Sequence, residues 1–236
     1  MKFGKKETPL KSPELMTGSK RKLLIKNDNF AVREAYKTLR TNVRFCLQGD
    51  KCKRICITSA MSGEGKSITF LNLAISIAEA GQKVLLIDAD LRRPALARLA
   101  GKMAIPGLSN VLAGLVKPEE AIRQEVYPNL DIIFSGDIPP NPSELLGADS
   151  FRTLIEELSL QYEYILIDAP PVNVVSDACI IANCVDGVLV LVRQGRSRKD
   201  FVKQAVNNLE LTGAKVLGFV LNGVQLETGQ KYGYYN

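Results

Sequence analysis

The sequence contains no long apolar run and no closely spaced pair of cysteines. No stretch approaches the roughly 20 apolar residues that a helix needs to cross a bilayer. The basic residues after Met1 are not followed by an apolar segment, so we expect no signal peptide. The five cysteines include no Cys-x-x-Cys pair and mostly lie in apolar runs. This usage favours reduced thiols in the core of a cytoplasmic protein over a disulfide framework or a metal site.

The body of the chain also lacks an excess of either charge. The net charge of +6 comes from 31 Lys and Arg against 25 Asp and Glu. Residues 1–26 hold eight of these bases and two of the acids, so residues 27–236 balance at 23 to 23. We therefore expect residues 1–28 to form a basic, flexible segment that either contacts an anionic surface or is merely solvated. A neutral body argues against a nucleic-acid partner, because it offers no basic face along a phosphate backbone.

The rest of the sequence alternates strand-like and helix-like segments. Apolar runs predict strands near residues 54–58, 83–88, 130–134, 164–168, 187–192 and 215–221. An amphipathic pattern predicts a first helix over 30–47, and further helices are predicted near 66–80, 94–100, 118–124, 149–160, 177–183 and 198–211. Several strands are apolar throughout, which is typical of strands buried on both faces. The sequence thus predicts one α/β domain over residues 29–222, with a mostly parallel sheet covered by helices on both faces.

A phosphate-binding loop follows the first predicted strand. The predicted helix over 66–80 comes after it. The candidate ATP-binding residues of the loop and of the start of this helix are Ala60, Met61, Ser62, Gly63, Glu64, Gly65, Lys66, Ser67 and Ile68. In such a loop, backbone N–H groups and a helix N-terminus surround the phosphates, the lysine reaches the outer phosphates and the serine is placed to hold Mg²⁺. The chain is therefore predicted to bind a nucleoside triphosphate. Asn222, after the last predicted strand, is a candidate for contact with the base.

Three aspartates end predicted strands at the edge where ligands bind in parallel sheets. Asp168 ends the strand 164–168, a position from which phosphate-binding-loop proteins hold magnesium. Asp88 and Asp90 end the strand 83–88. Ser67, Asp90 and Asp168 are therefore candidate Mg²⁺ ligands, and Asp88 is the first candidate to accept a proton, although the roles of Asp88 and Asp90 could be reversed. Helix capping is the alternative function of Asp90.

Four segments share their order and spacing with one known family: Gly63–Ser67, Leu85–Arg92, Ile138–Leu146 and Ile167–Pro171. Together they resemble the bacterial tyrosine kinases of capsule and exopolysaccharide synthesis, and the similarity runs from about residue 30 to the C-terminus. The resemblance implies a P-loop kinase that uses ATP and Mg²⁺. It also implies that Lys66, Asp88 and Asp90 are catalytic and that the kinase regulates polysaccharide synthesis and export.

The resemblance further implies several partners. Short kinases of this type pair with a separate membrane-anchored activator of the polysaccharide co-polymerase type, which would hold this chain at the inner face of the cell membrane. They form homo-oligomers, and a phosphotyrosine phosphatase is implied as a counteracting enzyme. No sequence feature identifies the activator or the polysaccharide.

The C-terminal tail, residues 223–236, is rich in tyrosine. Three of the seven tyrosines, Tyr232, Tyr234 and Tyr235, lie in the last five residues. The resemblance implies that these are autophosphorylated. Fully extended at about 3.3 Å per residue, the tail spans roughly 45 Å, long enough to enter the active site of a neighbouring subunit. A terminal strand or a plain oligomer contact is the alternative.

The predicted first helix carries Glu34, Lys37 and Arg40 near one face. These residues match the Glu-x-x-Arg-x-x-Arg pattern through which the family packs into a ring, with lysine in place of the middle arginine. Lysine keeps the charge but lacks the bidentate fork of arginine. A ring interface and ordinary surface ion pairing therefore both stay open.

Two other functions are alternatives to the kinase. A ParA/MinD-like ATPase switch shares the sheet and the second aspartate strand, but such proteins carry a signature lysine at the second loop position. This chain has Met61 there, which carries no charge. A nucleotide-gated scaffold of the export machinery would bind ATP without depending on phosphoryl transfer.

Overall fold

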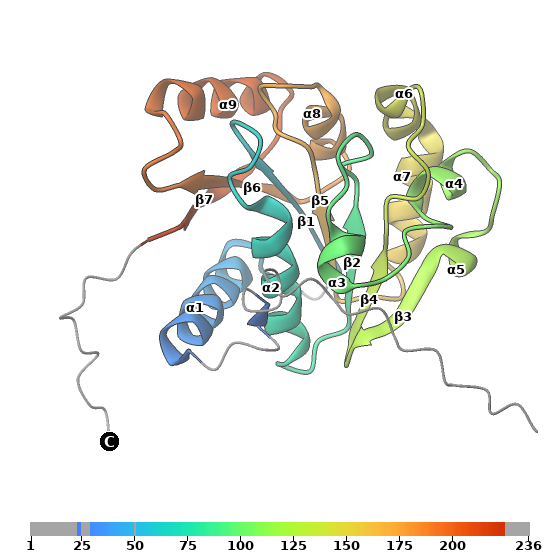
Figure 1. Ribbon diagram of the computed structural model, residues 1–236, viewed down its shortest axis with the longest axis horizontal. Helices are drawn as coiled ribbons and strands as arrows, with labels where there is room; N and C mark the ends of the chain where they lie inside the picture. Colours follow the sequence, from blue (N-terminus) through green and yellow to red (C-terminus); the bar gives the residue numbers. More distant parts are fainter. Residues whose placement is uncertain (1–22, 25–28, 50, 225–236) are drawn as a thin grey trace, which may run out of the picture.

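The computed structural model describes residues 23–24, 29–49 and 51–224, and in this part of the chain it contains a seven-stranded sheet. The spatial order is β3-β4-β2-β5-β1-β6-β7 (Figure 1). The strands are β1 (Lys53–Ser59), β2 (Val84–Asp88), β3 (Ile122–Tyr127), β4 (Leu130–Ile133), β5 (Tyr164–Asp168), β6 (Gly187–Arg193) and β7 (Val216–Asn222). All neighbouring pairs are parallel except β3 and β4, which confirms the predicted mostly parallel α/β sheet.

Helices cover both faces of the sheet (Figure 1). They are α1 (Phe30–Cys46), α2 (Lys66–Ala78), α3 (Leu96–Ala100), α4 (Leu108–Leu112), α5 (Pro118–Ala121), α6 (Pro142–Gly147), α7 (Asp149–Leu158), α8 (Asp177–Ala182) and α9 (Lys199–Leu211). Residues of α1, α2 and α3 form one core with the strands, and residues of α4 and α6–α9 form the other. Alternate residues of one strand enter different cores: Ile87 faces α7, whereas Leu86 faces α2.

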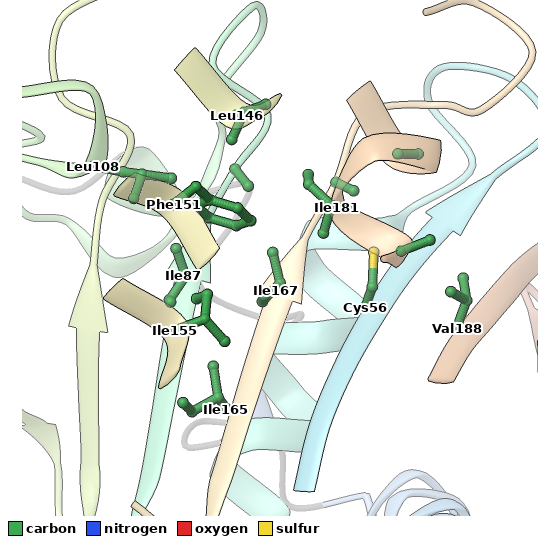
Figure 2. Packing of buried hydrophobic residues seen from close by; sticks show 14 of the residues in the cluster. Cys56, Ile87, Leu108, Leu146, Phe151, Ile155, Ile165, Ile167, Ile181 and Val188 are labelled. Atoms are coloured by element: carbon green, nitrogen blue, oxygen red, sulfur yellow. The ribbon is translucent and has the colours of Figure 1, made fainter. Parts of the chain in front are cut away.

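The core on the α7 side consists of buried apolar side chains that pack against one another. Phe151 and Ile155 of α7 lie against Ile87 and Ile167 of the central strands (Figure 2). All four side chains are 0% exposed. Continuous apolar runs in β2 and β5 are therefore explained by burial on both faces, as expected for a covered parallel sheet.

The structure corrects one predicted element. The helix predicted over 118–124 is only the short α5, and from Ile122 the chain forms β3, antiparallel to β4. Asn129 adopts a positive φ of 63° in the turn between these strands, a conformation that asparagine tolerates better than most residues. Hairpin pairing with β4 therefore overrides the helical pattern predicted for residues 122–124. Helix α4 was not predicted.

Part of the expected flexible segment 1–28 is packed on the domain. Leu24 is 1% exposed, and its backbone N–H donates to Oδ1 of Asn72 in α2 at 2.8 Å. The guanidinium of Arg33 donates to the carbonyl of Leu24 at 3.1 Å. Leu24 therefore belongs to the core between α1 and α2. In the described ranges, no helix has the length and apolar character needed to span a membrane.

Candidate functional site

The phosphate-binding loop connects the buried strand β1 to helix α2. Gly65 is the residue before the helix and has a φ of +104°, and Gly63 has a φ of +77°. The positive φ of Gly65 favours glycine, and a Cβ atom added there would also displace the side chain of Asn222. Lys66 begins α2 and is 7% exposed. The loop thus has the strand–turn–helix context that its motif requires.

Residues at the end of β6, in the turn after it and at the end of β7 form hydrogen bonds with the phosphate-binding loop. Nδ2 of Asn222 donates to the carbonyl of Glu64 at 2.9 Å, and Nη1 of Arg193 donates to the carbonyl of Gly63 at 3.1 Å. The Glu64 carboxylate is buried at 1% exposure, where it accepts from the Ser197 hydroxyl and from the N–H of Met61. The acidic side chain of the loop is therefore buried and bonded to the turn after β6.

These contacts give Asn222 a clear structural position. Its amide N–H contacts the loop, and its Oδ1 accepts from the N–H of Gly223 at 2.8 Å. Its predicted contact with the base stays a prediction. Arg193 and Ser197 were not found from the sequence, because no motif links them to a loop about 130 residues earlier.

Two aspartates lie side by side at the ends of neighbouring strands. Asp88 of β2 and Asp168 of β5 are paired in register, and both are 0% exposed. Oδ2 of Asp88 accepts from the N–H of Leu96 at 3.1 Å. Within the described residues, Oδ1 of Asp88 and both carboxylate oxygens of Asp168 have no hydrogen-bond partner.

The buried position changes the acidity of both groups. Burial raises the pKa of Asp168 to about 6, against the opposing effect of Lys66. Burial and the neighbouring Asp168 raise the pKa of Asp88 well above its usual value. Buried carboxylate oxygens without partners are costly unless a cation completes them. Their oxygen chemistry and position beside Ser67 therefore fit a hard divalent cation such as Mg²⁺.

Asp90 is half-buried and contacts its own turn. Its Oδ1 accepts from the N–H of Arg93 at 3.0 Å, which is the local bond expected of a turn-forming aspartate. Among the described residues, no group of three or more His, Cys, Asp or Glu is arranged to hold a metal.

The buried Asp177 forms an ion pair with Arg92, which follows β2 at the edge of the site. Asp177 is 0% exposed and accepts from Nε and Nη2 of Arg92 at 2.8 and 3.2 Å. The hydroxyl of Ser143 donates to the same carboxylate at 2.6 Å. Through these bonds the proline-rich segment 138–146 lies beside the turn that follows β2, so two of the sequence motifs are joined.

Comparison with known proteins identifies the family. A family model described as an AAA domain matches residues 52–214. Over 202 residues the chain is 39% identical to the tyrosine-protein kinase YwqD of Bacillus subtilis strain 168, covering 86% of this chain and 85% of that protein. The chain belongs to the bacterial tyrosine kinases. The kinase is therefore an enzyme with a nucleotide-binding P-loop, as the motifs imply.

Solved structures separate this kinase from the ATPase switches. It matches the chimerical protein CapA2B2 with a TM-score of 0.79 and 35% identity, over 85% of this chain and 88% of that one. The kinase domain of the Escherichia coli tyrosine kinase ETK matches with a TM-score of 0.79 and 36% identity, over 86% and 80% of the two chains. MinD of Pyrococcus horikoshii, complexed with Mg-ADP, matches with a TM-score of 0.62 and 28% identity, over 72% and 70%. The fold is shared with MinD, but the similarity to kinases is greater.

The residues of the predicted ring interface lie on α1. On α1, Nζ of Lys37 pairs with Glu34 at 2.7 Å at the surface, and Arg40 donates to the carbonyl of Ser76 in α2. Both cations thus have partners within the chain, and a ring interface stays a prediction. Tyr232, Tyr234 and Tyr235 lie outside the described residues.

Proposed function

We propose that this kinase transfers the γ-phosphoryl group of Mg-ATP to tyrosines of its own tail, and that it does so in trans within an oligomer. The observation that best supports this proposal is the pair of buried aspartates, Asp88 and Asp168, beside the phosphate-binding loop, because their carboxylates include oxygens that have no hydrogen-bond partner among the described residues. Three tyrosines in the last five residues are the proposed acceptors.

The loop and the carboxylates beside it would have different roles in phosphoryl transfer. Lys66 and the loop N–H groups would balance charge on the β- and γ-phosphates. Ser67, Asp90 and Asp168 would hold Mg²⁺, which when bound neutralises charge on the transferred group. The contacts from β6 and β7 would keep the loop fixed while this happens.

The acceptor hydroxyl needs a base, because a phenol with a pKa near ~10 is a weak nucleophile at neutral pH. Asp88 is our first candidate, since one of its oxygens has no partner among the described residues. Asp90 is the alternative, since it is half-buried and closer to solvent. Asp88→Asn and Asp90→Asn should separate the roles: loss of the metal ligand changes the Mg²⁺ requirement, whereas loss of the base lowers the rate at saturating Mg²⁺.

A mixing experiment tests the proposed acceptor and the trans mechanism together. One chain carries Lys66→Met with the tail tyrosines intact, and the other is active but has Tyr232, Tyr234 and Tyr235 replaced by phenylalanine. With Mg-ATP and a membrane activator, mass spectrometry should find phosphotyrosine on the tail of the Lys66→Met chain only in the mixture. No signal from the unmodified kinase, or an unchanged signal from Lys66→Met alone, would contradict the proposal.

The partners in the cell are also part of the proposal. We expect a membrane-anchored activator that holds the kinase at the inner face of the membrane, a homo-oligomer formed through Glu34, Lys37 and Arg40, and a phosphotyrosine phosphatase. The family resemblance supports a role in capsular or exopolysaccharide synthesis and export. Normal polysaccharide output from the triple phenylalanine variant would favour a nucleotide-gated scaffold instead.

A further inference from the structure

A basic pocket lies at the end of the sheet opposite the phosphate-binding loop. It has a volume of about 850 Å³ and is formed by the last turn of α1, the end of α2 and the first residues of β1 and β5. Those first residues, Lys53 and Tyr164, are paired in register, whereas the loop follows Ser59 at the other end of β1. Seven strand residues span roughly 20 Å, so the pocket is separate from the ATP site.

The pocket concentrates positive charge on an otherwise neutral body. Four cationic side chains line it, and Glu163 is the acidic residue among the described residues that line it. The carboxylate of Glu163 also accepts from the backbone N–H of Lys83 at 2.8 Å. The cations are Arg40, Arg44, Lys51 and Lys53. Four positive charges against one negative charge favour an anionic ligand.

Two of the cations are held in place before any ligand arrives. Arg40 donates to the carbonyl of Ser76 through Nη1. Nζ of Lys53 donates to the carbonyl of Gly49 at 3.0 Å and lies 5.3 Å from the centre of the Tyr164 ring. Fixed donors lose less conformational entropy on binding than mobile ones. Arg44 and Lys51 are exposed, so they are accessible to a ligand from solvent.

The wall of the pocket is apolar and aromatic. Phe45 on the last turn of α1 is 70% exposed, and Leu47, Ile77 and Ala80 form apolar lining beside it. An inorganic anion would contact only the cations. In a phosphorylated aromatic ring, the phosphate would contact the cations and the ring would contact the apolar wall. The pocket therefore fits the chemistry of phosphotyrosine better than that of inorganic phosphate.

We propose that this pocket binds phosphotyrosine in the C-terminal tail of a second copy of the kinase. Residues 225–236 contain one Lys and one Glu, so the tail is neutral until each phosphate adds about −1.5 to −2 charges. Binding would thus depend on the reaction having occurred. The tail follows β7, whose end contacts the phosphate-binding loop. The trans reaction proposed above already brings the tail of a second copy to the kinase, which favours a second copy as the source of the bound tail.

This inference rests on the proposed tail phosphorylation, and the experiment separates the two. A fluorescein-labelled peptide of residues 225–236, synthesised with phosphotyrosine at its three tyrosines, is titrated with the full chain in which the same three positions are phenylalanine. Fluorescence anisotropy is measured without ATP. Because the phosphates are installed chemically, a kinase that does not phosphorylate its tail can still bind this peptide, and failure of binding says nothing against tail phosphorylation.

Charge reversal in the pocket is compared with matched charge reversal elsewhere. The pocket variant is Arg44→Glu with Lys51→Glu, and its control is Arg152→Glu in α7 with Lys215→Glu before β7, which are also exposed. We expect the pocket variant to bind the phosphopeptide about tenfold or more weakly, as expected for loss of charge-assisted hydrogen bonds, and the control to stay within about twofold. Circular dichroism checks folding, and Arg44→Gln with Lys51→Gln gives a milder second variant.

Three results would overturn the proposal. The unphosphorylated peptide could bind as tightly as the phosphopeptide. The pocket and control variants could weaken binding equally. Inorganic phosphate could displace the phosphopeptide at an equal phosphate concentration, which would make the pocket a general anion site with no use for the aromatic ring.

Discussion

The hydroxyl of Ser197 fixes a buried acidic side chain of the phosphate-binding loop, and Ser197→Ala should therefore weaken both the fold and ATP binding. Ser197 lies in the turn after β6 and donates to the carboxylate of Glu64. Glu64 is 1% exposed, so water cannot replace the lost donor. The other bond to this carboxylate comes from the N–H of Met61 at 3.3 Å and is long. The carboxylate would then be left under-satisfied next to the site of a triphosphate.

The size of the effect follows from the charge on the acceptor. A hydrogen bond to a charged group contributes roughly 1.5–3 kcal/mol to the free energy of unfolding. When a buried acceptor loses its donor, the protein loses most of this stabilisation. For a domain of about this size, each kcal/mol corresponds to about 2–4 °C in melting temperature. We therefore expect Ser197→Ala to melt about 3–12 °C lower. ATP affinity should also fall, by about tenfold if one such bond is needed to hold the loop in its binding conformation.

Differential scanning fluorimetry and titration with a fluorescent ATP analogue measure the two quantities. Ser197→Thr keeps the hydroxyl and should restore most of both. Ser159→Ala is the matched control, because its hydroxyl donates at the surface to the carbonyl of Glu156 at the end of α7. If Ser197→Ala melts and binds nucleotide like the unchanged kinase, Glu64 does not hold the loop.

Three further predictions concern buried groups. Because burial raises the pKa of Asp168 to about 6 from 3.8, the folded kinase without metal or nucleotide retains a proton that the unfolded chain loses. Its free energy of unfolding should therefore fall as pH rises from about 4 to 6, and Asp168→Asn should reduce this dependence in urea titrations, with the raised pKa of Asp88 accounting for what is left. Asp177→Ala leaves Arg92 without its buried partner and should lower the free energy of unfolding in urea by about 2–3 kcal/mol. The control is Asp149→Ala, because Asp149 also begins a helix but is exposed, and it should cost less than about 1 kcal/mol. Phe151→Ala opens a cavity in the α7 core and should cost about 3–5 kcal/mol in the same assay.

The features found from the sequence are those that neighbouring residues encode. The phosphate-binding loop is a continuous motif with a fixed strand before it and a helix after it. Asp88 and Asp168 could be placed together because both end apolar strands, and parallel strands end at one edge of the sheet. The seven-residue strand β1 and helix α2 likewise follow from local apolar patterns.

The features that were missed depend on contacts between distant residues. Ser197 and Glu64 are 133 positions apart, and Asn222 and Glu64 are 158 apart. A serine in a polar turn carries no sign of such a partner. The hairpin of β3 and β4 was missed for a similar reason, since its pairing with a buried neighbour outweighs a weak helical pattern.

The sheet order suggests that nucleotide binding and phosphoryl transfer can be separated by mutation. In the order β2-β5-β1-β6-β7, strand β1 carries the loop at the centre. Ser197 and Asn222 support the loop from the β6–β7 side, whereas Asp88 and Asp168 lie on the β2–β5 side. Ser197→Ala should therefore raise the KM for ATP with a smaller change in kcat, because it affects the binding loop in every state of the reaction. Asp88→Asn should lower kcat with little change in that KM, because a base acts only as the tyrosine is deprotonated. Equal changes in both constants for both variants would contradict this division of the site.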